Sequence, residues 1–307
     1  MAHYDTVIIG GGPGGYTAAL YCARAGLKTL VLEKLSPGGQ MATTSWVDNY
    51  PGFEDGIDGF ELGEKMKRSA DRFGALSEFK EVISVALAAQ PKRIHTSDGD
   101  DTADTVILAT GASPRTLGLP EEEKLVNRGV AYCATCDGMM YKGKTVVVVG
   151  GGDTAVTDAL FLAKICTHVT LVHRRDTLRA SNSYLETIRK TANLTFMPDS
   201  KVSAILHDKK VTGAKIENIK TGEVTTLSCD GLFIAIGRTP NTELAKGQLD
   251  MDGNGYIVAD ETTRTSVPGV FAVGDVRTKP LRQIVTAAAD GAVASMSAEE
   301  YLFKIRE

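Results

Sequence analysis

The sequence predicts an α/β protein of two domains with parallel sheets, the second domain inserted into the first. Its 307 residues are about twice the usual length of one domain. Short runs rich in valine and isoleucine are followed by glycine clusters and helix-like stretches, a pattern typical of strands buried on both faces of a sheet. One such unit occurs twice, and two glycine–proline breaks bracket the second copy.

Composition and charge exclude several protein classes. Hydrophobic residues make up 43% and charged residues 23%, which excludes an intrinsically disordered chain. The 32 glycines have no collagen-like period. A net charge of −4 without a basic block disfavours general nucleic-acid binding. No apolar run approaches the ~18 residues of a membrane span, and residues 1–5 lead directly into a strand-like run without a signal peptide. We therefore expect a cytoplasmic protein.

The first repeat begins at the N-terminus. An apolar run at 6–9 is followed by GGGPGG at 10–15, which matches GxGxxG, and then by a helix-like stretch at 16–25. A second strand-like run at 29–32 ends in Glu33, 23 residues after Gly10. A carboxylate near this spacing hydrogen-bonds the ribose of a bound dinucleotide.

The second repeat aligns with the first without a gap at an offset of 140 residues. It comprises a strand at 146–149, GGGDTA at 150–155, a helix at 156–165 and a strand at 169–172. A dinucleotide pyrophosphate binds to backbone N–H groups at a helix N-terminus, where side chains on the turn would keep it away. Two complete copies predict two Rossmann-like dinucleotide-binding domains.

The two repeats differ where their second strands end. Glu33 aligns with His173, which is followed by Arg174, Arg175 and Arg179. Three arginines suit a phosphate on the ribose 2′ oxygen, whereas a carboxylate suits a free ribose. We therefore expect FAD in the first site and NADPH in the second, because this pair provides a hydride donor and an acceptor.

The breaks at 111–114 and 237–241 define the predicted domains. Residues 201–229 alternate polar and apolar side chains, which predicts a small antiparallel sheet, and 282–302 predicts a long helix. The expected domains are an FAD-binding domain at 1–114 and 241–307 and an NADPH-binding domain at 115–240.

The inserted domain carries a Cys-x-x-Cys sequence, Cys133 to Cys136, followed by Asp137. Such a pair closes a small disulfide ring at a helix start, where the helix dipole lowers the thiolate pKa. Asp137 could carry protons if burial raises its pKa. The alternative is half a zinc site, but His168 and His173 begin 32 residues further on, beyond the usual gap, and we expect no metal. The isolated cysteines, expected to be small buried residues, are Cys22, Cys166 and Cys229.

With these residues in hand, the whole chain resembles the bacterial low-molecular-weight thioredoxin reductases. The resemblance implies a homodimer that reduces thioredoxin with electrons passed from NADPH through FAD. It also implies that Cys136 faces the flavin, that Cys133 attacks the partner disulfide and that Asp137 is the acid. The motifs are GGGPGG at 10–15, GGQM at 38–41, NYPG at 49–52, CATCDG at 133–138, GGGDTA at 150–155, HRRDTLR at 173–179, GRTPN at 237–241, FAVGD at 271–275 and RQ at 282–283.

The glycine turns and the resemblance together give the candidate site residues. Those expected to bind FAD are Gly10, Gly12, Pro13, Gly15, Glu33, Gly38, Gly39, Gln40, Asn49, Gly111, Gly274, Asp275, Arg282, Gln283 and Ile284. Those expected to bind NADPH are Gly150, Gly152, Asp153, Thr154, Ala155, His173, Arg174, Arg175, Arg179, Ile236 and Gly237. Those expected to contact the partner are Arg128, Met139 and Met140, the two methionines standing where the family often has aromatics.

Three other functions remain alternatives. A flavoprotein subunit of a peroxide-reducing system looks similar but carries an extra N-terminal dithiol domain, for which Gly10 leaves no room. A flavin carrier or sensor would use the cysteine pair only for metal or structure. Ferredoxin-linked relatives look degraded in the second glycine turn and the basic run, which are intact here. Finally, both the dithiol and the nicotinamide must reach the flavin, so we expect the inserted domain to rotate about 111–114 and 237–241.

Overall fold

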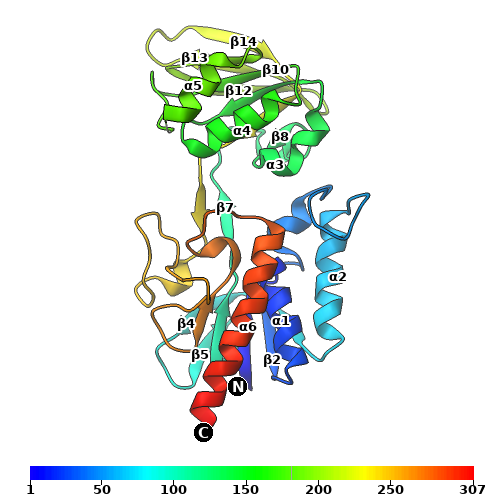
Figure 1. Cartoon of the computed structure of the whole chain (residues 1–307), viewed down its shortest axis with the longest axis vertical. Helices are drawn as coiled ribbons and strands as arrows, with labels where there is room; N and C mark the ends of the chain where they lie inside the picture. The colour runs from blue at the N-terminus through cyan, green and yellow to red at the C-terminus, as the bar shows by residue number, and fades with distance from the viewer. Residues whose placement is uncertain (181) are drawn as a thin grey trace. The chain divides into compact units, whose positions relative to one another are not determined.

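The computed structural model describes residues 1–180 and 182–307 and confirms the predicted α/β class (Figure 1). The chain divides into two compact units. Unit 1 comprises Met1–Ser113 and Thr239–Glu307, and unit 2 comprises Pro114–Arg238. Unit 2 is therefore inserted into unit 1, and each unit has a main sheet of its own that contains parallel strands.

Unit 1 is built on a mixed sheet with the strand order β3-β2-β1-β6-β5-β4, in which β17 also pairs with β6. The first repeat supplies β1 and β2, which are parallel with Thr6 opposite Thr29. β4 and β5 extend the sheet as an antiparallel hairpin, and β5 is antiparallel to β6. The strands are β1 (His3–Ile9), β2 (Thr29–Glu33), β3 (Leu76–Phe79), β4 (Val82–Ala86), β5 (Lys92–Thr96), β6 (Gly99–Leu108) and β17 (Val270–Ala272).

Three helices belong to unit 1: α1 (Pro13–Arg24), α2 (Gly59–Asp71) and α6 (Ile284–Arg306). Helices α1 and α6 lie side by side (Figure 1). Their backbones approach so closely that a Cβ atom on Gly291 would come within 2.3 Å of the Gly14 carbonyl oxygen. Tyr16 of α1 and Phe271 of β17 are buried in the hydrophobic core to which both α1 and α6 contribute. The short 3-10 helices of this unit are η1 (Gly39–Thr43), η4 (Glu243–Ala245) and η5 (Gly274–Val276).

Unit 2 contains a parallel sheet with the strand order β11-β10-β9-β15-β8. The second repeat supplies β9 and β10, joined by α4. The sequence-predicted antiparallel sheet is confirmed as β12-β13-β14. The elements are β8 (Val130–Ala131), β9 (Thr145–Val149), β10 (His168–Val172), β11 (Leu194–Met197), β12 (Ser200–His207), β13 (Val211–Asn218), β14 (Val224–Ser228), β15 (Gly231–Ile234), α3 (Ala134–Asp137), α4 (Asp153–Ala163), α5 (Asn182–Lys190), η2 (Glu123–Leu125) and η3 (Gly138–Tyr141).

Two short strands mark the places where the chain passes between the units. β7 (Ala112–Pro114) pairs with β16 (Arg238–Pro240). Gly111, with φ at 72°, precedes β7, and Gly237, with φ at 104°, precedes β16. Both lie in the left-handed region, which glycine adopts without strain.

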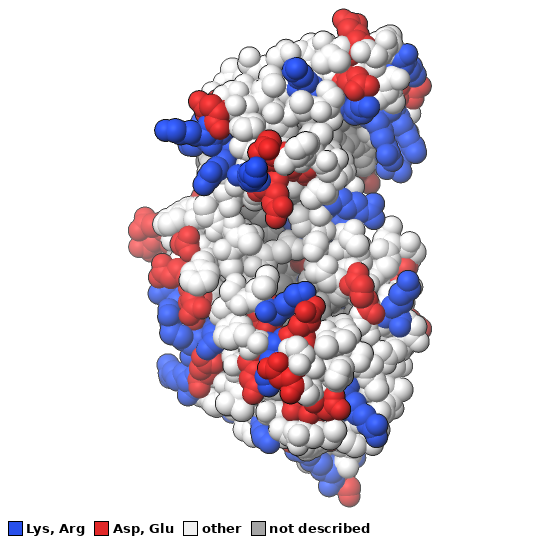
Figure 2. Space-filling view, turned by 180° about the vertical axis from the view of Figure 1, so that it is seen from behind, with Lys and Arg blue, Asp and Glu red and all other residues white. Residues whose placement is uncertain are grey.

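The charged surface is mixed. On the face shown in Figure 2, Lys and Arg side chains are interspersed with Asp and Glu side chains, in keeping with the small net charge of −4. None of the helices in the described part of the chain has the length and apolar character needed to cross a bilayer.

Candidate functional site

The first glycine turn joins β1 to α1 through close backbone approaches. A Cβ atom on Gly10 would lie 2.4 Å from the Ala109 carbonyl oxygen, and one on Gly15 would lie 1.9 Å from the Gly10 carbonyl oxygen. Only glycine fits at these two positions. In contrast, a Cβ atom on Gly12, the N-cap of α1, would meet no described atom within 4 Å. The first turn of the helix, beginning at Pro13, therefore opens onto free space in which an anion can approach the backbone N–H groups.

Glu33, at the end of β2, lies beside this turn. Its Oε2 atom accepts a hydrogen bond from the Gly11 amide at 2.6 Å, and its Oε1 atom accepts one from the Lys34 amide at 2.8 Å. The strand end and the glycine turn thus hold the carboxylate in place. This is where the repeat predicts the ribose-binding acid.

A second segment reaches the same turn. The amide of Gly38 donates to the Gly11 carbonyl at 2.8 Å, and a Cβ atom on Gly39 would lie 3.4 Å from the Gly12 Cα. Gln40 follows in η1, and its side-chain amide donates to the Ala112 carbonyl. The structure therefore brings these three predicted FAD residues to the first glycine turn and to the residue after Gly111.

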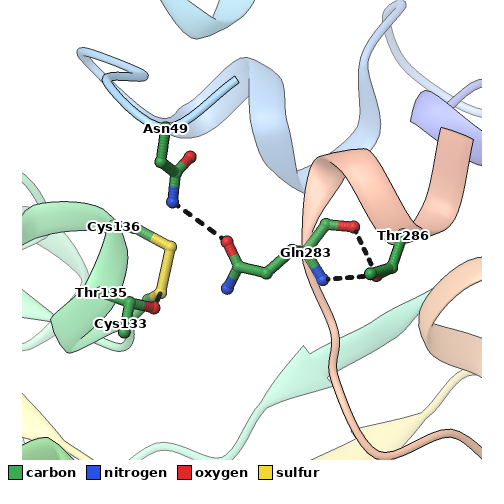
Figure 3. The surroundings of a disulfide bond; sticks show 6 residues. All are labelled: Asn49, Cys133, Thr135, Cys136, Gln283 and Thr286. Atoms are coloured by element: carbon green, nitrogen blue, oxygen red, sulfur yellow. Dashed lines mark hydrogen bonds between the residues drawn. A yellow bond between two sulfur atoms is a disulfide. The ribbon is translucent and has the colours of Figure 1, made fainter. Parts of the chain in front are cut away.

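The segment at 274–284 contributes a further group of predicted FAD residues. Gln283 is the N-cap of α6, where it forms a capping box with Thr286, and its Oε1 atom accepts a hydrogen bond from Asn49 Nδ2 at 3.1 Å (Figure 3). Ile284 is the first residue of the helix. Arg282 lies over the Tyr256 ring, 4.0 Å from its centroid, and its Nε atom donates to the Asp275 carbonyl.

The second glycine turn repeats this design in unit 2. A Cβ atom on Gly150 would lie 2.4 Å from the Ala235 carbonyl oxygen and 2.6 Å from the Ala155 Cβ atom. Gly152 is again the N-cap of the following helix, and no described atom lies within 4 Å of its Cβ position. Asp153 and Thr154 are exposed in the first turn of α4. Ile236 and Gly237 follow one residue after the end of β15, the strand beside β9.

His173 occupies the position that Glu33 has in the first repeat. Its ring lies against Gly151, where a Cβ atom would come within 2.3 Å of Cε1. The ring is buried, and its Nε2 atom has no hydrogen-bond partner among the described residues. Burial lowers the pKa of His173, and Arg179, Arg175 and Arg174 lower it further. The imidazole is therefore neutral at pH 7, with one nitrogen free to meet a ligand.

The three arginines of the basic run are all exposed. The Arg179 amide donates to the Gly151 carbonyl at 2.7 Å, which holds this loop against the glycine turn. The run thus provides cationic side chains next to the open N-terminus of α4. Such a cluster of cationic side chains suits a second anion, in addition to a pyrophosphate.

Cys133 and Cys136 form a disulfide, with their Cα atoms 5.3 Å apart (Figure 3). Cys133 is the N-cap of α3, a helix of four residues, and its Sγ atom lies 3.4 Å from Thr135 Oγ1. Because α3 is a single turn, its dipole favours a thiolate less than a longer helix would. Asp137 ends this helix, and burial raises its pKa to about 6. A carboxyl group with this pKa can donate a proton near neutral pH.

The other sequence-predicted residues lie as follows. Arg128 is exposed, and its carbonyl accepts a hydrogen bond from the Val211 amide at 2.8 Å. Met139 and Met140, in η3 directly after the dithiol helix, are 52% and 40% exposed. Such exposure of two large apolar side chains suits contact with a partner. The three isolated cysteines are buried and unpaired, as predicted.

Sequence reasoning missed Asp290, although this residue has one of the most connected side chains in unit 1. Its Oδ2 atom accepts hydrogen bonds from the Gly274 amide at 2.8 Å and from Lys279 Nζ at 2.7 Å. The available signal was one acidic residue in the small-residue run AAADGA of a buried helix, where a carboxylate requires partners.

Comparisons with known proteins identify the family of this chain. Residues 4–291 match the model of the pyridine nucleotide-disulphide oxidoreductase family. A thioredoxin reductase of Streptomyces coelicolor is 48% identical over 97% of this chain and 94% of its own length, and one of Listeria monocytogenes is 45% identical over 99% and 95%. The crystal structure of thioredoxin reductase from Streptococcus pyogenes superposes with a TM-score of 0.92 at 44% identity, covering 98% of this chain and 99% of that one. The chain therefore belongs to the thioredoxin reductases of the pyridine nucleotide-disulphide oxidoreductase family, and it is an oxidoreductase.

Proposed function

We propose that the protein reduces the disulfide of thioredoxin with electrons from NADPH, using FAD in unit 1 and the Cys133–Cys136 pair in unit 2. The observation that carries this proposal is the disulfide itself, which is followed directly by a half-buried acid in the unit that also holds the second glycine turn. A metal or purely structural role would not require an acid of raised pKa next to the cysteines.

The residues of unit 1 fit FAD. The open space at Gly12 can receive a pyrophosphate, and the carboxylate of Glu33 can accept hydrogen bonds from ribose hydroxyls. Gly38, Gly39 and the segment from Gly274 to Ile284 would complete the site. Bound FAD would supply the acceptance of a hydride and the transfer of two electrons to a disulfide.

The residues of unit 2 fit NADPH better than NADH. The open space at Gly152 can receive the pyrophosphate, and the exposed arginines at 174, 175 and 179 can bind the 2′-phosphate. His173 is neutral and has a free nitrogen, so it does not repel an anion as a carboxylate would.

The dithiol would act by thiol–disulfide exchange. The Cys133 thiolate attacks one sulfur of the thioredoxin disulfide, and the other sulfur leaves as a thiolate. The Cys136 thiol then attacks Cys133 and gives up its proton to the second thioredoxin sulfur as that sulfur leaves, which re-forms the disulfide and releases reduced thioredoxin. Asp137, with its pKa raised to about 6, donates a proton to a leaving thiolate. Two electrons and two protons leave with the product.

Exposed Arg128, Met139 and Met140 would contact the partner protein. Methionine adapts to different partner surfaces, so another small thioredoxin-like protein or a peroxide-reducing partner is the alternative substrate. We further propose that the protein acts as a homodimer in the cytoplasm.

We also propose that the two units rotate relative to each other between the half-reactions. Gly111 and Gly237 have positive φ and precede the paired strands β7 and β16, so a few residues can absorb the change in backbone angles. Cross-linking unit 1 to unit 2 through engineered cysteine pairs should leave one half-reaction intact and stop turnover. Full turnover by completely cross-linked protein would contradict the rotation.

The central test is an anaerobic titration of the holoenzyme with NADPH while the flavin spectrum is recorded, followed by addition of oxidised thioredoxin. The wild-type flavin should bleach and then recover. Cys133→Ser and Cys136→Ser should bleach but reduce no thioredoxin, whereas Cys166→Ser, at a buried unpaired cysteine, should behave like wild type. Thioredoxin reduction by either dithiol variant would exclude the proposed function.

A further inference from the structure

Asp290 lies on α6 in unit 1, and its side chain is only 9% exposed. Arg277 binds both oxygens of this carboxylate, Oδ2 through Nε at 2.9 Å and Oδ1 through a terminal nitrogen at 2.7 Å. Lys279 Nζ and the Gly274 amide bind Oδ2, at 2.7 Å and 2.8 Å. One buried carboxylate thus satisfies four donor groups from three residues.

These donors belong to the segment that precedes α6, and they tie its parts together. Gly274 begins η5, the turn that contains Asp275. Lys279 Nζ also donates to the Thr286 carbonyl at 3.1 Å, in the first turn of α6. Asp290 therefore connects the η5 turn, the connection after it and the start of α6 within one network.

The network has an excess of positive charge. Arg277 and Lys279 have side chains only 4% and 5% exposed, and each forms an ion pair with the single carboxylate of Asp290. Burial would raise the pKa of Asp290, but hydrogen bonds from Arg277, Lys279 and Gly274 outweigh it and lower the pKa. Asp290 consequently stays ionised, and its loss would remove the carboxylate with which both buried cations form their ion pairs among the described residues.

We infer that Asp290 is a positioning residue of the flavin site, which holds the turn at Gly274 and Asp275 and the helix start at Gln283 and Ile284 in the arrangement that binds FAD. This inference rests on the proposed FAD site in unit 1. The Gly274 amide is fixed directly by Asp290, and the Asp275 carbonyl and the Arg277 carbonyl are bridged by Arg282. Without the carboxylate, the cations and the Gly274 amide must find other acceptors, and the turn must move.

The test is FAD affinity. Apoprotein is titrated with FAD, and binding is followed by quenching of the flavin fluorescence. Asp290→Asn should raise the dissociation constant roughly 10- to 100-fold, the value expected for losing hydrogen bonds to a charged group. The matched control is Glu300→Gln on the same helix, because Glu300 is exposed and pairs only with exposed Arg264 among the described residues. The control should bind FAD like wild type.

Melting temperatures of the apoproteins separate positioning from a purely structural role. The titration is run at a temperature at which both apoproteins are folded. A structural role would lower the melting temperature and leave the dissociation constant unchanged, and this result would overturn the inference. If Asp290→Asn does not fold, the double variant Asp290→Asn/Lys279→Met keeps the net charge of the network, and unchanged FAD affinity in it would likewise refute the role. Failure of wild type itself to bind FAD would instead refute the proposed function.

Discussion

Asp137 should make the protein less stable at neutral pH, and Asp137→Asn should reverse this effect. Burial raises the pKa of Asp137 from 3.8 to about 6. Each unit of such a shift corresponds to about 1.4 kcal/mol, so the ionised carboxylate costs about 3 kcal/mol of folding free energy. Asparagine has nearly the same shape and no charge. We expect the substitution to stabilise the protein by up to about 3 kcal/mol at pH 8.

The sign of this effect fixes its pH dependence. Between pH 3.8 and pH 6 the folded protein retains the Asp137 proton that the unfolded chain has lost, so raising the pH destabilises the wild type over this window. Above pH 6 both forms are ionised and the full cost remains. At pH 5 the difference between variant and wild type should be about half of that at pH 8, and it should vanish below pH 3.8.

Urea unfolding of both proteins at pH 5 and pH 8 measures the difference. The matched control is Asp176→Asn, which removes an exposed carboxylate from the same unit and should change the unfolding free energy little. The Asp137→Asn variant should also lose most of its thioredoxin reduction, because an amide cannot donate the proton. An Asp137→Asn protein that is no more stable than wild type at pH 8 would contradict the burial argument.

Two further predictions follow from the glycine turns and the basic run. Replacing Arg174 and Arg175 together by alanine should raise the KM for NADPH at least tenfold and leave the KM for NADH nearly unchanged, since each charged hydrogen bond contributes about 1.5–3 kcal/mol. Steady-state assays with both nucleotides measure this, and an unchanged ratio of the two KM values would contradict the proposed binding of the 2′-phosphate by these arginines. Gly12→Ala should fold normally and bind FAD more weakly, because its Cβ would enter the open space that the proposed pyrophosphate occupies. Gly15→Ala should not yield folded protein, because its Cβ would lie 1.9 Å from the Gly10 carbonyl oxygen. Circular dichroism and FAD titration distinguish the two variants, and a folded Gly15→Ala protein would contradict the clash.

The sequence was sufficient to predict the two repeats because their signals are local. Each complete unit of strand, glycine turn, helix and second strand occupies about 30 consecutive residues. The glycines are required because close contacts within the turn or with a neighbouring strand leave no room for a side chain. β1, β2, β9 and β10 lie where the pattern placed them, whereas α1 and α4 begin at Pro13 and Asp153, three residues before the predicted helix starts at 16 and 156. Glu33 and His173 could be located as well, because a strand end next to a glycine turn has little freedom.

The elements that the sequence did not predict have weaker patterns or depend on distant partners. Strands β3 and β4 are mostly exposed, so they lack the continuous apolar run of a buried parallel strand. The role of Asp290 depends on Gly274, 16 residues earlier, and on the path of the loop between them. A spacing of this kind has no period, and only the folded chain shows it.

The two glycine turns also differ in a way that supports the proposal of two different ligands. Glu33 ends β2 and His173 directly follows β10, and each lies against the middle glycine of its turn: Glu33 accepts a hydrogen bond from Gly11, and the His173 ring lies against Gly151. The backbone position is therefore conserved between the repeats, and only the charge changes. A carboxylate at 173 would repel a 2′-phosphate and neutralise the neighbouring arginines, whereas a neutral imidazole does neither. The choice of side chain at this one position, together with the basic run that follows it, therefore supports our proposal that the second site binds a phosphorylated dinucleotide.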